Sequence, residues 1–137
     1  MTEKILCAID DIEHSRVAVI HAAELAAKLH APLVICSVNG LSGGLRGPPI
    51  YLHDEAEIKK LLDFAVELAK SHGAKKVSET EIKARLVASA VIQYAEQEGI
   101  TQIVVGTGDK RGLVRMVLGS VAGEIAARAH CTVVVAR

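Results

Sequence analysis

Apolar positions along the chain alternate between two patterns: short continuous runs and longer segments with helical spacing. The runs at 4–10 and 32–38, KILCAID and PLVICSV, are almost uninterrupted apolar sequence, which is typical of strands covered on both faces. The Ala-rich segment between them carries apolar residues at near-helical spacing and predicts a helix over 13–30. The chain therefore begins as strand, helix, strand.

The same alternation continues to the end of the chain. An apolar stripe from 58 to 69 predicts a second helix that ends before Gly73, and a third helix is expected to end near Gly99. Strands separated by helices of this length pair in parallel through right-handed crossovers. The sequence thus predicts an α/β fold with an open, doubly wound sheet of five parallel strands and helices on both faces. The remaining elements are strands at 77–86, 100–106 and 131–137 and a helix at 120–130.

Length and composition fit one domain, spanning 1–137. Hydrophobic residues make up 50% of the chain but aromatic residues only 2%, so Val, Ile, Leu and Ala must build the core. One connection, 39–54, is rich in Gly and longer than most. We expect it to be irregular, because such connections are often lids or disordered segments.

Charge and apolar run length restrict the partners. Sixteen basic and sixteen acidic residues give a formal net charge of zero, which argues against binding nucleic acid or an anionic membrane. Apolar runs fall short of the roughly 18 residues of a membrane span, and we expect a cytoplasmic protein. Cys7, Cys36 and Cys131 are widely spaced in apolar sequence; we expect buried small hydrophobes in a reducing compartment, without a redox role.

The strongest candidate site lies where the predicted strands end. In open α/β sheets, ligands bind beyond the carboxyl ends of the strands, which here are Asp10, 38–40 and Gly106 onward. From Gly106 the chain reads GTGDKRGLVRMVLGS, and Gly119 with Ser120 stands before a predicted helix. Unpaired backbone N–H groups and the helix dipole make such a start an anion site. The residues alone are equally consistent with turn glycines and an N-cap serine.

These motifs, with the opening ILCAIDDIEHS and the closing LGSVAGEIAARAHCTVVVAR, resemble the universal stress protein family over essentially the whole chain. Its nucleotide-binding members carry Gly, two residues, Gly, nine residues, then Gly and Ser or Thr. The resemblance implies that an adenine nucleotide, ATP above all, acts as a regulatory ligand in stress response. It also implies a homodimer formed through the final strand, 132–136. By the same resemblance Asp10 faces the ribose or adenine, Val38 offers backbone contacts to adenine, and Gly106, Gly108, Gly119, Ser120 and Val121 form the phosphate loop.

Asp109 departs from the family pattern, because it stands where the second glycine belongs. A carboxylate repels phosphate unless a cation intervenes, and its Cβ blocks an approach that glycine permits. The turn can be re-registered through Gly108. Alternatively, Asp109 can hold Mg²⁺ on the nucleotide, or Lys110, Arg111 and Arg115 can supply positive charge.

Two further departures from the family pattern reduce the space available to a ligand. Arg85 and Leu86 stand near the presumed pocket, where they can fill it, and Asp11 and Ile12 replace a small Gly-Ser pair beside Asp10. These departures support an alternative hypothesis: a dimeric interaction protein of the same family, with a degenerate nucleotide site and an unidentified protein partner.

Catalysis has little support in the sequence. It lacks the GxxxxGK[ST] motif of P-loop enzymes, and we expect no enzymatic activity beyond weak ATP hydrolysis. Asp10, His14 and Ser15 suggest a triad, but polar residues at a helix start are more often caps or surface residues. His53 and the acidic residues after it are better interpreted as a charged helix entrance than as a metal site.

Overall fold

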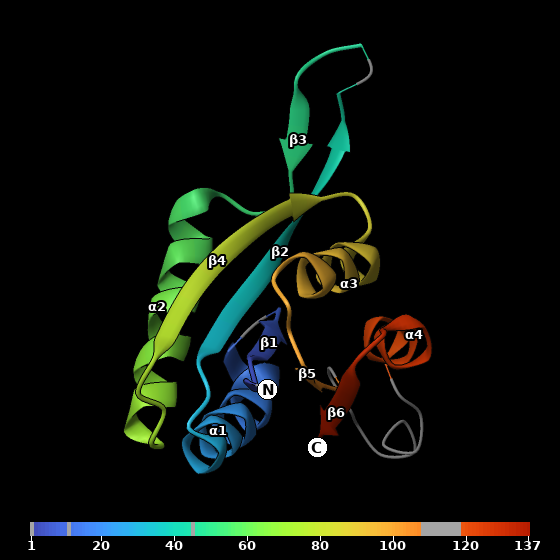
Figure 1. Ribbon diagram of the computed structural model, residues 1–137. Coiled ribbons are helices and arrows are strands. Elements are labelled where there is room, and N and C mark those ends of the chain that lie inside the picture. The colour runs from blue at the N-terminus through green and yellow to red at the C-terminus, as the bar shows by residue number, and fades with distance from the viewer. Residues whose placement is uncertain (1, 11, 45, 108–118) are drawn as a thin grey trace.

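The computed structural model describes residues 2–10, 12–44, 46–107 and 119–137. Within that part of the chain, strands and helices alternate much as the sequence predicts (Figure 1). The strands are β1 (Ile5–Ile9), β2 (Leu33–Gly43), β3 (Pro49–Tyr51), β4 (Val77–Ala84), β5 (Gln102–Gly106) and β6 (Thr132–Ala136). The helices are α1 (Ile12–Leu29), α2 (Glu55–Ser71), α3 (Val87–Gln97) and α4 (Ser120–Arg128).

The five longer strands form one parallel sheet in the order β4-β2-β1-β5-β6. Strand β1 lies at its centre, with Cys7 opposite Ile35 of β2 on one side and Val104 of β5 on the other. The chain runs from β1 outward to β2 and β4, then crosses to β5 and β6. This reversal beside β1 makes the sheet doubly wound and confirms the predicted fold class.

Side chains that alternate along the central strands build a separate core on each face of the sheet. Ile5, Cys7 and Ile9 pack with α1 and α2, whereas Leu6 packs with α3 and α4. Figure 1 shows these two pairs of helices on opposite sides of the sheet. The continuous apolar runs of the sequence are thus explained by strands that helices cover on both faces.

The segment 39–54 is not the irregular connection that the sequence analysis expects. Strand β2 continues to Gly43 and turns back through β3, which pairs antiparallel with Leu41 opposite Tyr51 and Gly43 opposite Pro49. The prediction was wrong because this segment lacks an apolar run, while the backbone groups of β2 and β3 still satisfy one another. In Figure 1 the hairpin, residues 40–52, extends beyond the body of the sheet.

Helix α2 begins and ends at residues with identifiable roles. Asp54 is its N-cap and accepts a hydrogen bond from the Glu57 N–H at 2.9 Å. Gly73 follows its end with φ of +102° and donates to the Lys70 carbonyl. A Cβ at Gly73 would lie 3.3 Å from the Ala27 side chain, so both backbone and packing favour glycine, as predicted.

Cys7 and Cys36 are fully buried on β1 and β2. Burial raises the pKa of the Cys36 thiol to about 12 and that of Cys7 further still. Cys131 is half-buried, in partial agreement with the expectation. Among the described helices, none combines the length and hydropathy that crossing a membrane requires.

Candidate functional site

A pocket of about 400 Å³ lies beyond the carboxyl ends of β1 and β5, where the chain reverses direction across the sheet. Asp10 after β1, Val38 of β2 and Gly106 of β5 line it, together with Gly119 and the first residues of α4. Helices α1 and α4 lie on opposite faces of the sheet at this point. The structure therefore gathers the described candidate residues at the edge where this fold binds ligands.

Asp10 and Ser15 both line the pocket and are hydrogen-bonded to each other. The Ser15 hydroxyl donates to Asp10 Oδ1 at 3.1 Å and accepts from the Asp10 backbone N–H at 3.3 Å. Ser15 is only 4% exposed, whereas Asp10 is exposed. Ser15 is therefore a buried partner of the candidate site rather than the surface or capping residue that the sequence analysis favours.

Val38 lines the pocket but does not end its strand, as the sequence analysis assumes. Pairing between β1 and β2 stops at Ile9 opposite Ser37, while β2 continues beside β4 to Gly40 opposite Ala84. Val38 is consequently the first residue of β2 beyond the end of β1. A ligand beyond β1 can reach its backbone, because the neighbouring strand no longer covers that side.

The start of α4 is built differently from the prediction. Gly119, not Ser120, is the N-cap, and it makes no side-chain capping hydrogen bond. Ser120 is the first helical residue, is exposed and lines the pocket with Val121. The first N–H groups of a helix lack partners within the helix. Since no side chain of the described residues caps this end, the pocket contains a helix terminus suited to an anion.

The central part of the predicted phosphate loop lies outside the described residues. It contains Gly108, Asp109 and the basic residues at 110, 111 and 115, and Asp11 is likewise outside. Over the described ranges, the structure has no group of three or more His, Cys, Asp or Glu side chains arranged to hold a metal ion.

Arg85 and Leu86 do not fill the pocket, contrary to the expectation. The Arg85 guanidinium donates to the Gly43 carbonyl in the hairpin, and Leu86 is 70% exposed as the extended N-cap of α3. Strand β4 ends at Ala84, so the chain turns before these side chains could point inward. Their neighbour Val87 lines the pocket instead.

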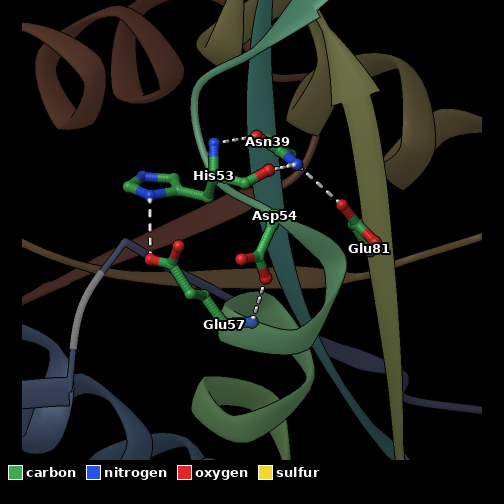
Figure 2. Close-up of polar contacts among 5 residues, drawn as sticks. All are labelled: Asn39, His53, Asp54, Glu57 and Glu81. Atoms are coloured by element: carbon green, nitrogen blue, oxygen red, sulfur yellow. Dashed lines mark hydrogen bonds and ion pairs between the residues drawn. The ribbon is translucent and has the colours of Figure 1, made fainter.

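The last residue of the hairpin and the residue after it line the pocket, and sequence reasoning missed both. Leu52 and His53 line the pocket, and the buried Asn39 side chain holds them in place (Figure 2). Asn39 accepts from the His53 N–H at 2.9 Å and donates to the His53 carbonyl at 2.7 Å and to Glu81 at 2.9 Å. The one sequence signal that could have indicated these two residues was Asn39, a polar residue directly after an apolar strand.

Val91 and Thr107 also line the pocket, and both are at least nine-tenths buried. Val91 lies on the apolar face of α3, where its sequence context indicates only core packing. Thr107 follows the β5 glycine and belongs to the motif already quoted. The pocket wall therefore combines apolar surface from α3 with polar groups from the strand ends.

A second depression, of about 480 Å³, lies between α2 and β4. Its lysines are paired with carboxylates: Lys59 contacts Asp63 and Glu79 at 2.7 and 2.5 Å, and Lys83 contacts Glu55 at 2.5 Å. These contacts lower the pKa of Glu55 and Asp63. The depression is better explained as a solvated ion-pair surface than as a ligand site.

A family model of the universal stress proteins matches residues 1–137. The chain belongs to this family. Universal stress protein YxiE of Bacillus subtilis (strain 168) is 30% identical over 150 residues, covering 100% of both chains. Both matches cover the whole chain, as the resemblance of the sequence motifs did.

Solved universal stress proteins share the fold. One, in complex with cAMP, has a TM-score of 0.78 at 20% identity and covers 98% of this chain and 97% of its own. Another, from Archaeoglobus fulgidus in complex with dAMP, has a TM-score of 0.74 at 22% identity, with 100% and 98% covered. At such identities the likeness establishes the fold alone.

Proposed function

We propose that this universal stress protein binds an adenine nucleotide, ATP above all, as a regulatory ligand in stress response. The observation that carries the proposal is one pocket lined both by Asp10 and by the start of α4, which no side chain of the described residues caps. A carboxylate accepts from hydroxyl or amine groups, whereas a helix start binds phosphate. A nucleotide carries all of these groups, and two similar folds hold cAMP and dAMP.

Different pocket residues contact different parts of the nucleotide: those near β2 contact adenine, and those after β5 and at the start of α4 contact the phosphates. Val38, past the end of β1, offers backbone groups to adenine, and Leu52, Val87 and Val91 supply apolar surface for its ring. Gly106, Gly119, Ser120 and Val121 surround the phosphates. The volume of about 400 Å³ lies within the range of small-molecule sites.

On sequence grounds alone, the proposal assigns Gly108 and Asp109 to the phosphate end of ATP. Gly108 allows the backbone to approach the phosphates. Asp109 holds Mg²⁺ on them, because carboxylate and phosphate oxygens are the ligands that this ion prefers. The bound metal offsets the repulsion between Asp109 and the phosphates.

Regulation requires that the nucleotide favour one arrangement of the protein over another. The hairpin, residues 40–52, is suited to report occupancy, because Leu52 at its base lines the pocket while its tip lies away from the sheet. Hydrogen exchange tests this point: ATP should slow exchange in the hairpin, and unchanged protection at saturating ATP would count against the switch.

We further propose that the protein is a cytoplasmic homodimer formed through β6. Within the described residues β6 pairs with β5 alone and ends the sheet, and Val133 to Ala136 are only half-buried. An uncovered edge of this kind pairs with a second copy. Sedimentation equilibrium should give twice the mass of 14.5 kDa, and Val135→Lys should give the monomer; a monomeric wild type contradicts the dimer.

A second candidate function is a dimeric interaction protein that binds no nucleotide. Its supporting observation is the exposure of three large apolar side chains on and beside the hairpin: Ile50 at 67%, Leu52 at 74% and Leu86 at 70%. The partner of such a surface is a protein. Ile50→Ser with Leu86→Ser should then abolish partner capture from lysate.

Thermal unfolding with added ligand tests the nucleotide proposal. A ligand that binds only the folded state stabilises it by about 2.7 kcal/mol at a hundredfold excess over its Kd. ATP should raise the Tm of the wild type, with adenosine and inorganic triphosphate giving smaller increases. An Asp10→Ala variant should show a reduced shift. If millimolar ATP leaves the wild-type Tm unchanged, the nucleotide proposal fails and the second candidate is favoured.

A further inference from the structure

His53 brings a titratable side chain to the lining of the candidate pocket. It follows the hairpin and directly precedes Asp54, the N-cap of α2. The sequence analysis interprets it as part of a charged helix entrance, whereas the structure places it in the pocket wall. An imidazole titrates between about pH 5 and 8. The charge of the pocket wall can therefore change near neutral pH.

The backbone of His53 is fixed, while its ring is available to a ligand. Asn39 hydrogen-bonds both polar groups of the His53 backbone, and Figure 2 shows the ring extending away from Asn39. The side chain is 41% exposed, and its Nδ1 lies 3.8 Å from Glu57 Oε2. Within the described residues the ring makes no hydrogen bond. Both ring nitrogens donate when the ring is protonated, so the ring is suited to an anionic partner.

The described lining of the pocket has one side chain that can become positive, and it is His53. The described carboxylates on the surrounding elements are Glu57 of α2, Asp10 after β1 and Glu81 of β4. Glu81 accepts from the Asn39 amide, and Lys83 of β4 is paired with Glu55. Within this part of the chain, His53 is therefore the side chain of the pocket wall that can offset the negative charge of a ligand.

The size of the pocket brings a bound anion close to the ring. A volume of about 400 Å³ suits one small ligand, and His53 and the start of α4 line the same pocket. A ligand that fills the pocket contacts both, so its negative charge lies within a ligand's width of the imidazole. Opposite charges this close favour the protonated ring.

We propose that His53 is a ligand-binding residue whose imidazole takes up a proton when an anionic ligand enters the pocket, so that phosphorylated ligands bind more tightly as pH falls. The inference rests on the proposed nucleotide function and deepens it. The proton passes from the solvent to the unprotonated ring nitrogen, and no covalent bond to the ligand forms. Proton and anion each favour the binding of the other by the same factor. The added affinity is therefore present at low pH and is lost as pH rises through the range in which the ring titrates.

The test titrates wild type and His53→Gln with ATP by calorimetry at pH 6.5, in two buffers of different ionisation enthalpy, PIPES and Bis-Tris. The difference in heat between the buffers gives the number of protons taken up on binding. The proton change of ATP itself is common to both proteins, so the difference between them isolates the ring. The wild type should take up a clear fraction of one proton more than His53→Gln. Between pH 6 and pH 8, its ATP affinity relative to His53→Gln should fall about 5-fold or more.

A matched variant and a direct measurement separate this role from general damage. His72→Gln removes an exposed imidazole at the C-cap of α2, outside the pocket lining, and should leave the proton uptake unchanged. His53→Gln should keep the Tm of the wild type within a few degrees, because Asn39 bonds the backbone of His53 and not its ring. In NMR spectra of the wild type, the ring signals of His53 should titrate at higher pH when ATP is bound.

The outcomes distinguish this inference from the proposal on which it rests. If wild type and His53→Gln bind ATP with the same proton uptake and the same pH dependence, the inference is overturned while the nucleotide function stands. An equal loss of proton uptake in His72→Gln also overturns it, since the effect is then not specific to the pocket. If the wild type binds no ATP at millimolar concentration, the nucleotide function itself fails and the inference fails with it.

Discussion

The buried side-chain amide of Asn39 hydrogen-bonds to both polar groups of the His53 backbone, at 2.9 Å to its N–H and 2.7 Å to its carbonyl (Figure 2). This pair ties the returning chain of the hairpin to β2, fourteen residues earlier. The same amide donates to Glu81 of β4. One side chain thus fixes two pocket residues, Leu52 and His53, against the sheet.

Asn39→Ala should reduce the free energy of unfolding by about 1 to 3 kcal/mol, because it leaves partly buried backbone groups of His53 without their hydrogen-bond partner. Urea denaturation measures the change. Ser78→Ala, at an exposed position of β4, is the control and should stay within about 0.5 kcal/mol of the wild type. A loss no larger than that of the control would show that the Asn39 contacts contribute nothing net.

Asn39→Asp should be destabilised in a pH-dependent manner. It sets a carboxylate where the amide lies 2.9 Å from Glu81 Oε2, and the like charge raises the pKa of the introduced carboxyl in the folded state. A raised pKa means that the deficit is small at low pH and grows as pH rises. Unfolding free energies at pH 4 and pH 7 measure this, and a deficit independent of pH would contradict it.

Ser120→Asp should weaken nucleotide binding without weakening the fold. A carboxylate in the first turn of α4 interacts favourably with the helix dipole, by about 0.3 to 1 kcal/mol. The same charge repels phosphate, and the affinity for ATP should fall about tenfold or more. Ser120→Ala is the uncharged control. If the Asp and Ala variants bind ATP equally well, phosphate does not lie at this helix start.

Asp109→Gly and Asp109→Asn separate the charge of Asp109 from its size. If Asp109 holds Mg²⁺, both variants should lose the Mg²⁺ enhancement of ATP binding, because neither carries a carboxylate. If Asp109 closes the site instead, Asp109→Gly should acquire ATP binding that the wild type lacks. Calorimetry with and without Mg²⁺ distinguishes the two. Unchanged Mg²⁺ dependence in both variants would exclude the metal role.

Ile35→Ala and Ile50→Ala form a matched pair that tests the core. Ile35 is fully buried on β2, and its truncation should cost about 2 to 5 kcal/mol of unfolding free energy. Ile50 is 67% exposed on β3, and the same truncation should cost less than about 0.5 kcal/mol. Comparable losses at both positions would mean that the hairpin packs against something in solution, such as a second copy.

The sheet was predictable from sequence because its strands are covered on both faces. Continuous apolar runs such as 32–38 could be recognised without knowing the topology, and Gly73 marked a helix end through its backbone requirement. The extension of β2 and its pairing with β3 could not be predicted in this way. The paired residues, 41–43 of β2 and 49–51 of β3, are exposed or half-buried. They are held by backbone pairing and by Asn39, which leave no apolar period in the sequence.

The candidate site was predictable where it depends on strand ends and glycines. Asp10, Gly106 and Gly119 were named from sequence, and the structure brings them to one pocket. The role of Ser15 was missed, because a serine at a helix start is ordinary and only the fold shows that its hydroxyl meets Asp10. Leu52 and His53 were missed because, like β3, they lie in a segment without an apolar period in the sequence.

Calorimetric titration with ATP and with AMP, each with and without Mg²⁺, tests the central claim most directly. The account predicts saturable binding of ATP that Mg²⁺ strengthens, with AMP bound in a manner independent of the metal. No detectable binding of either nucleotide at millimolar concentration would contradict the account.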